Sequence, residues 1–109
     1  MKTITIDGTV YVPLNSEGCL EPTPFQTGKS YLIRTVTMIL VGKAVSLKGQ
    51  FLTLIQAAWI ADTGRFSECL EHGAEKFNEV EVVQGDVFVG IGSIIDVYEW
   101  PHPLPTETK

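Results

Sequence analysis

Cysteine and histidine are scarce in this chain, which has two of each among its 109 residues. Cys19 and Cys69 lie far apart, and no cleavable apolar leader precedes them, so we predict free thiols in a reducing compartment rather than a disulfide. His72 and His102 have no cysteine, histidine or carboxylate at metal-binding spacing. The sequence therefore predicts no metal ion and no other cofactor.

Basic residues are also few, since 8 lysines and arginines stand against 13 acidic residues and give a net charge of −5. An acidic surface repels polyphosphate, which argues against long DNA or RNA as a partner. A small anionic ligand stays open, because it needs only one or two well-placed arginines. The apolar run from Val36 to Val41 is far too short to span a bilayer, so no membrane partner is expected.

The sequence motifs of common enzyme classes are absent as well. The chain has no Gly-x-Ser-x-Gly, no His-Glu-x-x-His and no paired Cys-x-x-Cys. Gly90-Ile91-Gly92 lacks the third glycine and the following helix of a dinucleotide-binding loop, so it predicts a bend between strands. We expect a protein that is not an enzyme; the alternative is an enzyme that uses Asp62 or Glu71 as a base.

What the chain does contain is the alternation typical of β-strands. Residues 2–12 alternate around Asp7-Gly8, which predicts a hairpin, and residues 15–29 form an irregular arm rich in proline, glycine, serine and threonine. Further strands are expected at 30–41, 44–55 with a turn at Lys48-Gly49, 79–83, 86–89 and 93–100. The segments 79–83 and 86–89 are expected to form a hairpin around Gln84-Gly85. Apolar residues on both sides of the 30–41 strand indicate burial of both faces, where Arg34 needs an anionic partner or access to solvent.

One short helix is expected near 63–72. Its apolar residues follow helical spacing on one stripe: Phe66, Cys69 and Leu70. Either residue of Asp62-Thr63 can accept the unpaired amide protons of the first turn, and Gly73 is suited to the C-terminal end.

The expected fold class is α+β and rich in β-structure, with an antiparallel twisted sheet or a partly open small barrel and one short helix packed across it. An apolar content of 44% and a charged content of 19% fit one globular domain of this length. We expect an N-terminal hairpin and irregular arm at 1–29, a single core at 30–100 and a proline-rich tail at 101–109.

The strand-to-helix junction at 57–66 is the strongest candidate for a ligand site. The first turn of a helix offers free amide protons that attract anions. Gly64 permits close approach of the backbone, Arg65 can bind a phosphate or carboxylate in a bidentate manner, and Trp59 can stack on a base. The full set of candidate ligand-binding residues is Trp59, Thr63, Gly64, Arg65, Arg34 and Tyr31. The alternative is structural, with Trp59 in the core, Asp62 as the helix cap and Arg65 paired with an acid.

Three segments of the chain are distinctive beyond their secondary structure. They are Ile6-Asp7-Gly8-Thr9-Val10-Tyr11-Val12-Pro13, then Tyr31-Leu32-Ile33-Arg34-Thr35 leading through Val41-Gly42 into Lys48-Gly49, and Ala57-Ala58-Trp59-Ile60 followed by the helix that ends at His72-Gly73. Together they resemble a group of small bacteriophage-encoded proteins of unknown function. The resemblance implies a phage origin and action in the host cytoplasm, and no particular reaction.

The residues and the resemblance together favour a non-catalytic phage accessory protein. We expect it to counteract host defence by binding a small nucleotide signal or a host defence protein. It would act as a homo-oligomer, because subunit interfaces create enclosed pockets that one short chain lacks. The alternative is a structural or assembly component of the virion, in which the N-terminal hairpin and the tail serve as arms between subunits.

Overall fold

A computed structural model describes residues 4–6, 9–11 and 24–109 of the chain, with side chains for 24–109. Its elements are β1 (Ile4–Ile6), β2 (Thr9–Tyr11), β3 (Ser30–Thr35), β4 (Ile39–Lys48), β5 (Phe51–Asp62), α1 (Phe66–His72), the 3-10 helix η1 (Ala74–Lys76), β6 (Glu79–Val82), β7 (Val87–Gly90), the 3-10 helix η2 (Ile91–Ser93) and β8 (Ile94–Glu99). β1 pairs with β2 in antiparallel fashion, which confirms the N-terminal hairpin. Its expected turn, Asp7-Gly8, and most of the irregular arm lie outside the described residues, as does Cys19.

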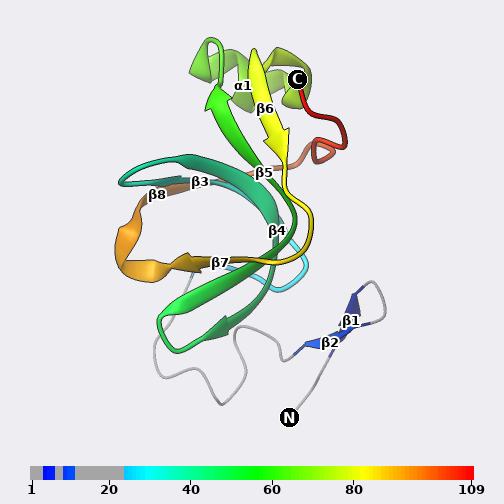
Figure 1. The fold of residues 1–109 in the computed structure, drawn as a ribbon, viewed down its shortest axis with the longest axis vertical. Coiled ribbons are helices and arrows are strands. Elements are labelled where there is room, and N and C mark those ends of the chain that lie inside the picture. The colour runs from blue at the N-terminus through cyan, green and yellow to red at the C-terminus, as the bar shows by residue number, and fades with distance from the viewer. Residues whose placement is uncertain (1–3, 7–8, 12–23) are drawn as a thin grey trace.

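The other strands form one antiparallel sheet in the order β6-β5-β4-β3-β8, with β7 paired to β5. The long strand β5 carries β7 along its residues 51–54 and β6 along its residues 58–62, while β4 covers its other edge. The sheet curls on itself, and η2 links β7 to β8 across the gap (Figure 1). No ladder joins β7 to β8 in the described sheet, so the curl stays open. The fold is thus α+β, β-rich and antiparallel, as the sequence predicts.

The apolar core is divided between the two faces of this sheet, because side chains alternate along each strand. One cluster fills the inside of the curl: Phe25, Tyr31, Ile33, Leu40, Ala44, Leu52, Leu54, Ala57 and Val89. The second cluster lies on the opposite face, where α1, η1 and the C-terminal segment cover the sheet: Leu32, Val41, Ala58, Ile60, Cys69, Phe77, Val80 and Trp100. The predicted burial of both faces of the 30–41 region is therefore correct.

Three expected elements differ from the structure. The single strand at 30–41 is in fact two strands joined by a tight turn, in which the Thr35 amide donates to the Met38 carbonyl at 2.8 Å and the Met38 amide donates to the Thr35 hydroxyl at 3.0 Å. A threonine hydroxyl can replace a backbone partner in a turn, and this overrides the strand propensity of its neighbours. The expected hairpin of 79–83 with 86–89 is also wrong, because β6 and β7 each pair with β5. Finally, the two strands expected within 44–55 are longer in the structure, because β4 begins at Ile39 and β5 continues to Asp62.

The helix begins later than the sequence indicates. Its N-cap residue is Arg65, whose side chain makes no capping hydrogen bond. The expected cap, Asp62, instead accepts the Gly64 amide at 2.8 Å, which closes the turn before the helix. At the other end Gly73 has a φ of 95° and donates its amide to the Cys69 carbonyl, as expected of the residue that ends a helix. None of the described helices has both the length and the apolar character needed to cross a membrane.

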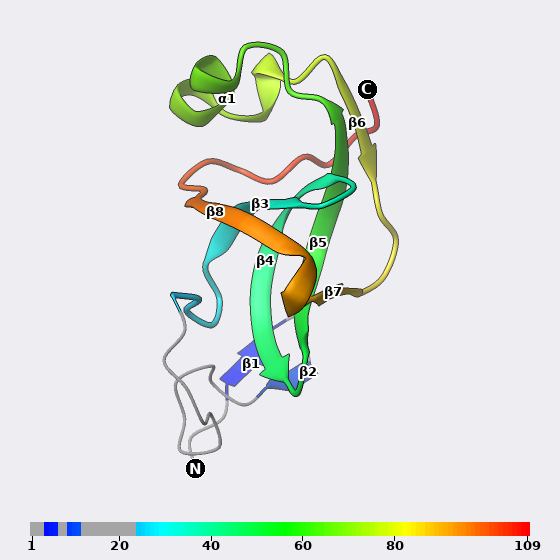
Figure 2. The ribbon, with the colours of Figure 1, turned by 90° about the vertical axis from the view of Figure 1, so that its left-hand side faces the viewer.

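The proline-rich segment after β8 packs on the body of the same chain (Figure 2). Trp100 is buried and stacks on Phe77, with ring centroids 5.5 Å apart, and its amide donates to the Ser30 carbonyl. Farther on, Lys109 and Val80 exchange two backbone hydrogen bonds at 2.8 and 3.0 Å, so the segment also attaches to the outer edge of β6. Residues 101–108 therefore form a strap that is fixed at both ends.

Candidate functional site

The junction residues Thr63 and Gly64 use their polar groups within the turn itself. The Gly64 amide donates to Asp62 Oδ1, and the Thr63 hydroxyl donates to the Gly64 carbonyl at 2.9 Å. Gly64 has a φ of 68°, and a Cβ atom placed there would lie 2.6 Å from the Lys76 carbonyl oxygen. The turn is therefore packed tightly against the end of η1, and its amide is already bound to a carboxylate.

Arg34 has the anionic partner that the sequence requires of it. It faces Asp96 across the β3–β8 ladder and binds it in a bidentate manner, with Nε donating to Oδ1 at 2.7 Å and Nη2 donating to Oδ2. The Tyr98 hydroxyl donates to the same carboxylate at 3.1 Å, and the guanidinium lies 5.8 Å from the ring centroid of Phe66. Hydrogen bonds from Arg34 are the main cause that lowers the pKa of Asp96. The positive charge of Arg34 is thus balanced within the fold.

The other three predicted site residues lie in different surroundings. Tyr31 is 2% exposed inside the curl, where its hydroxyl accepts the Gln26 amide, and burial raises its pKa. Trp59 is 37% exposed and pairs with Leu40 on the inner face of the sheet. Arg65 is exposed at the start of α1 and forms no ion pair with a described residue. Tyr31 and Arg34 lie on opposite faces of β3, so the structure does not bring all six residues together.

A larger hollow lies between the strap and the sheet. It has a volume of about 580 Å³, within the range of small-molecule sites. Its described lining combines polar and apolar side chains: Ser30, Lys43, Gln56, Val82, His102, Pro103, Leu104, Pro105 and Thr106. Lys43 is the one charged side chain in that lining, and it forms no ion pair with a described carboxylate. The hollow therefore offers a positive charge beside an apolar wall.

The sheet side of this hollow is shaped by a β-bulge. Val41 pairs with Ala58 and Lys43 pairs with Ile55, so Gly42 faces two residues of β5. One of these, Gln56, has a φ of 52° and is the only residue other than glycine with a positive φ in the described part of the chain. Gly42 makes room for the bulge, because a Cβ atom there would lie 3.1 Å from that of Ala57. Strained residues of this kind are enriched at binding sites, which supports a ligand-binding role for the sheet side of the hollow.

The strap side of the hollow is held in place by His102. Its Nε2 lies 2.8 Å from the Leu70 carbonyl oxygen, so Nε2 carries the proton and donates to it. The ring also contacts Trp100 edge-on at a centroid distance of 5.0 Å. A smaller hollow of about 400 Å³ lies on the other side of the strap, against α1 and η1. His102 thus anchors the strap between the two hollows.

Sequence patterns do not identify the residues that line the larger hollow. The sequence permits a bend or bulge at Gly42-Lys43, and the structure has a bulge there, but nothing in the pattern shows that Gln56 lies opposite it. His102 lacks metal ligands near it in sequence, and its partner, Leu70, is 32 positions away. Among the described residues, no group of three histidine, cysteine or acidic side chains could hold a metal ion. No protein-family model, no curated protein and no solved structure matches this chain.

Proposed function

We propose that this chain is a non-catalytic binding protein that holds a small anionic ligand in the hollow beneath the strap. The observation that supports it most directly is the lining, in which Lys43 is the one charge and an apolar wall faces it. A cation in a partly apolar site favours ligands that have a carboxylate or phosphate and an apolar portion. A nucleotide is one such ligand, so the expectation of a nucleotide signal moves from the junction to this hollow.

Two reactive side chains support a binding role over catalysis. The Cys69 thiol is buried and donates to the Phe66 carbonyl at 3.1 Å, while the Ser93 hydroxyl donates to the Gly90 carbonyl at 2.7 Å. Neither is directed at a general base, which nucleophilic catalysis needs. Of the two alternative bases, Asp62 binds the Gly64 amide and Glu71 is exposed on α1.

The biological setting stays a proposal that rests on the resemblance to phage proteins. In that setting the protein acts in the host cytoplasm as an accessory factor against host defence, capturing a signal molecule as a homo-oligomer. The second candidate is a virion assembly component, in which ligand binding has no part. The strap makes the first candidate the better one, because the C-terminal segment lies folded against its own chain and does not extend toward a neighbour.

Calorimetric titration tests the proposal with a panel of cyclic and linear nucleotides and short aliphatic carboxylates. We expect at least one member to bind the folded protein and Lys43→Gln to weaken it by about 10- to 100-fold, the value of one charge-assisted hydrogen bond. Lys76→Gln is the matched control, because this lysine lies on η1 outside the described lining. Failure of the whole panel to bind, or equal affinity in the Lys43 variant, would remove the proposal.

A further inference from the structure

Charge is distributed unevenly along the chain. Residues 24–61 contain four basic residues and no acid, whereas residues 62–82 contain six acidic and two basic residues. The molecule is 41 Å long, and Figure 1 shows α1, η1 and β6 at one end of its long axis and the β4–β5 hairpin at the other. The protein is therefore polarised along its length in spite of its overall negative charge.

The acidic end consists of exposed carboxylates on α1, η1 and the strands beside them: Asp62, Glu68, Glu71, Glu75, Glu79 and Glu81. None of the five glutamates forms an ion pair with a lysine or arginine among the described residues. Glu71 Oε2 lies 3.8 Å from His72 Nε2. With six acidic and two basic residues in 62–82, this end has a net negative charge.

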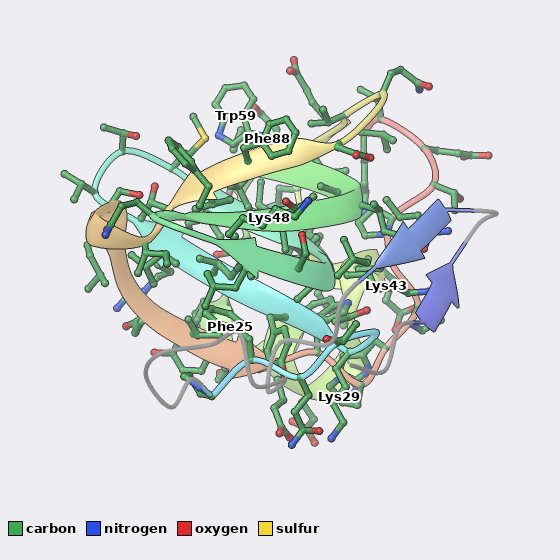
Figure 3. The ribbon with its side chains drawn as sticks, turned by 90° about the horizontal axis from the view of Figure 1, so that it is seen from below. Phe25, Lys29, Lys43, Lys48, Trp59 and Phe88 are labelled. Carbon is green, nitrogen blue, oxygen red and sulfur yellow. The ribbon has the colours of Figure 1, made fainter. Side chains whose placement is uncertain are left out.

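The opposite end, which we call the basic end, combines Lys29 and Lys48 with two exposed aromatic rings. Phe51 is 52% exposed and Phe88 is 65% exposed. Phe51 pairs with Lys48 across β4–β5, and Phe88 pairs with Thr53, two residues farther along the same face of β5. Figure 3 looks onto this end and shows Lys48 near its middle, with Phe88 on one side and Lys29 on the other. One acid, Asp86, precedes β7.

We infer that the basic end binds the acidic end of a second copy of this chain, so that subunits associate head to tail. Aromatic rings are enriched in protein interfaces, where they supply buried area, and charges at the rim select the partner. The acidic end of the same chain provides the surface that complements the basic end. A contact between two different patches produces a closed ring or an open filament.

This inference concerns assembly alone and does not depend on the hollow beneath the strap. A basic face with aromatic rings could also bind single-stranded nucleic acid by stacking. The self-contact is favoured because the acidic end provides a matching surface at the same concentration as the basic end. A nucleic acid must also approach a chain whose net charge is −5.

Sedimentation velocity on the ligand-free protein tests the inference. We expect oligomers at about 50 mM salt that dissociate at about 500 mM, because ionic screening weakens exposed charge pairs. Lys48→Glu should weaken association at least tenfold, as should the double variant Glu68→Lys/Glu71→Lys. Phe88→Ser should weaken association at about 50 mM salt, because it removes buried apolar area from the contact. The control Glu99→Lys changes an exposed acid on β8, outside both ends, and should leave assembly intact.

A mixture of two variants tests the pairing of the two ends most specifically. The Lys48→Glu variant keeps an intact acidic end, and the Glu68→Lys/Glu71→Lys variant keeps an intact basic end, so one native contact can form between them. Each should be monomeric alone, while an equimolar mixture should form a 1:1 complex. A wild-type monomer at every salt concentration, or oligomers that Lys48→Glu leaves unchanged, would refute the inference. Binding of a labelled oligothymidine that Lys48→Glu abolishes, with no self-association, would assign the basic end to nucleic acid instead.

Discussion

Replacement of Gly64 by alanine tests whether this glycine is needed for packing of the turn or for binding of a ligand at the junction. Gly64 has a φ of 68°, which disfavours a side chain by about 1–2 kcal/mol. The added Cβ would also lie 2.6 Å from the Lys76 carbonyl oxygen and near the Asn78 side chain. Overpacking of this kind costs about 1–3 kcal/mol more. We therefore expect Gly64→Ala to lower the free energy of unfolding by about 2–5 kcal/mol in total.

The matched control is Gly49→Ala, in the turn between β4 and β5. Gly49 has a similar φ of 56°, but no atom lies within 4 Å of the added Cβ. It should therefore lose only the conformational part, about 1–2 kcal/mol. Urea unfolding followed by tryptophan fluorescence and far-UV circular dichroism measures both variants, and equal slopes would show that the unfolded states are comparable. Equal losses for the two variants would refute the packing argument. A stable Gly64→Ala protein that no longer binds anions would return the ligand site to the junction.

The remaining predictions concern one ion pair and two buried side chains. Arg34 lowers the pKa of Asp96, so the pair stabilises the fold above pH 3.8, the ordinary pKa of an aspartate, and loses this effect as the pH falls below it. The urea midpoints of wild type and Asp96→Asn should therefore converge in acid. Burial raises the pKa of Cys69, so its thiol should react with a disulfide reagent far more slowly in the native protein than in urea, and equal rates would contradict its burial. Trp100→Ala should cost about 3–5 kcal/mol in denaturant unfolding, whereas Trp59→Ala should cost less than about 1, and the reverse order would show that the core is misassigned.

The strands were the part of the fold that the sequence could predict, because alternation reports directly on which face is buried. The expectation that Arg34 needs an anionic partner or access to solvent was equally sound, and its side chain has both, since it binds Asp96 and is 44% exposed. Its partner, Asp96, lies 62 positions away on β8. Only the ladder between β3 and β8 identifies that carboxylate, and local patterns contain no information about strand order.

The errors at the turns have a common physical cause. Both the break after Thr35 and the late start of α1 depend on which backbone amide a short polar side chain selects. Asp62 can cap a helix or close a turn at Gly64, and both choices satisfy one amide proton. Tertiary packing decides between them, because the Gly64 turn must fit against the Lys76 carbonyl. The same contact occupies the Gly64 amide that the sequence offers to a ligand at the junction.

The bulge opposite Gly42 shows why the hollow beneath the strap could not be predicted. A regular β4–β5 ladder would keep Gln56 in register with a partner on β4 and leave no irregularity there. The extra residue shifts the alternation along β5, so that Leu54 and Ala57, three positions apart, both face the inner core cluster. A left-handed glutamine costs about 1 kcal/mol or more, and glycine there would remove that cost. The positive φ of Gln56 is therefore a second argument, beside the charge of Lys43, that the sheet side of this hollow has a binding role.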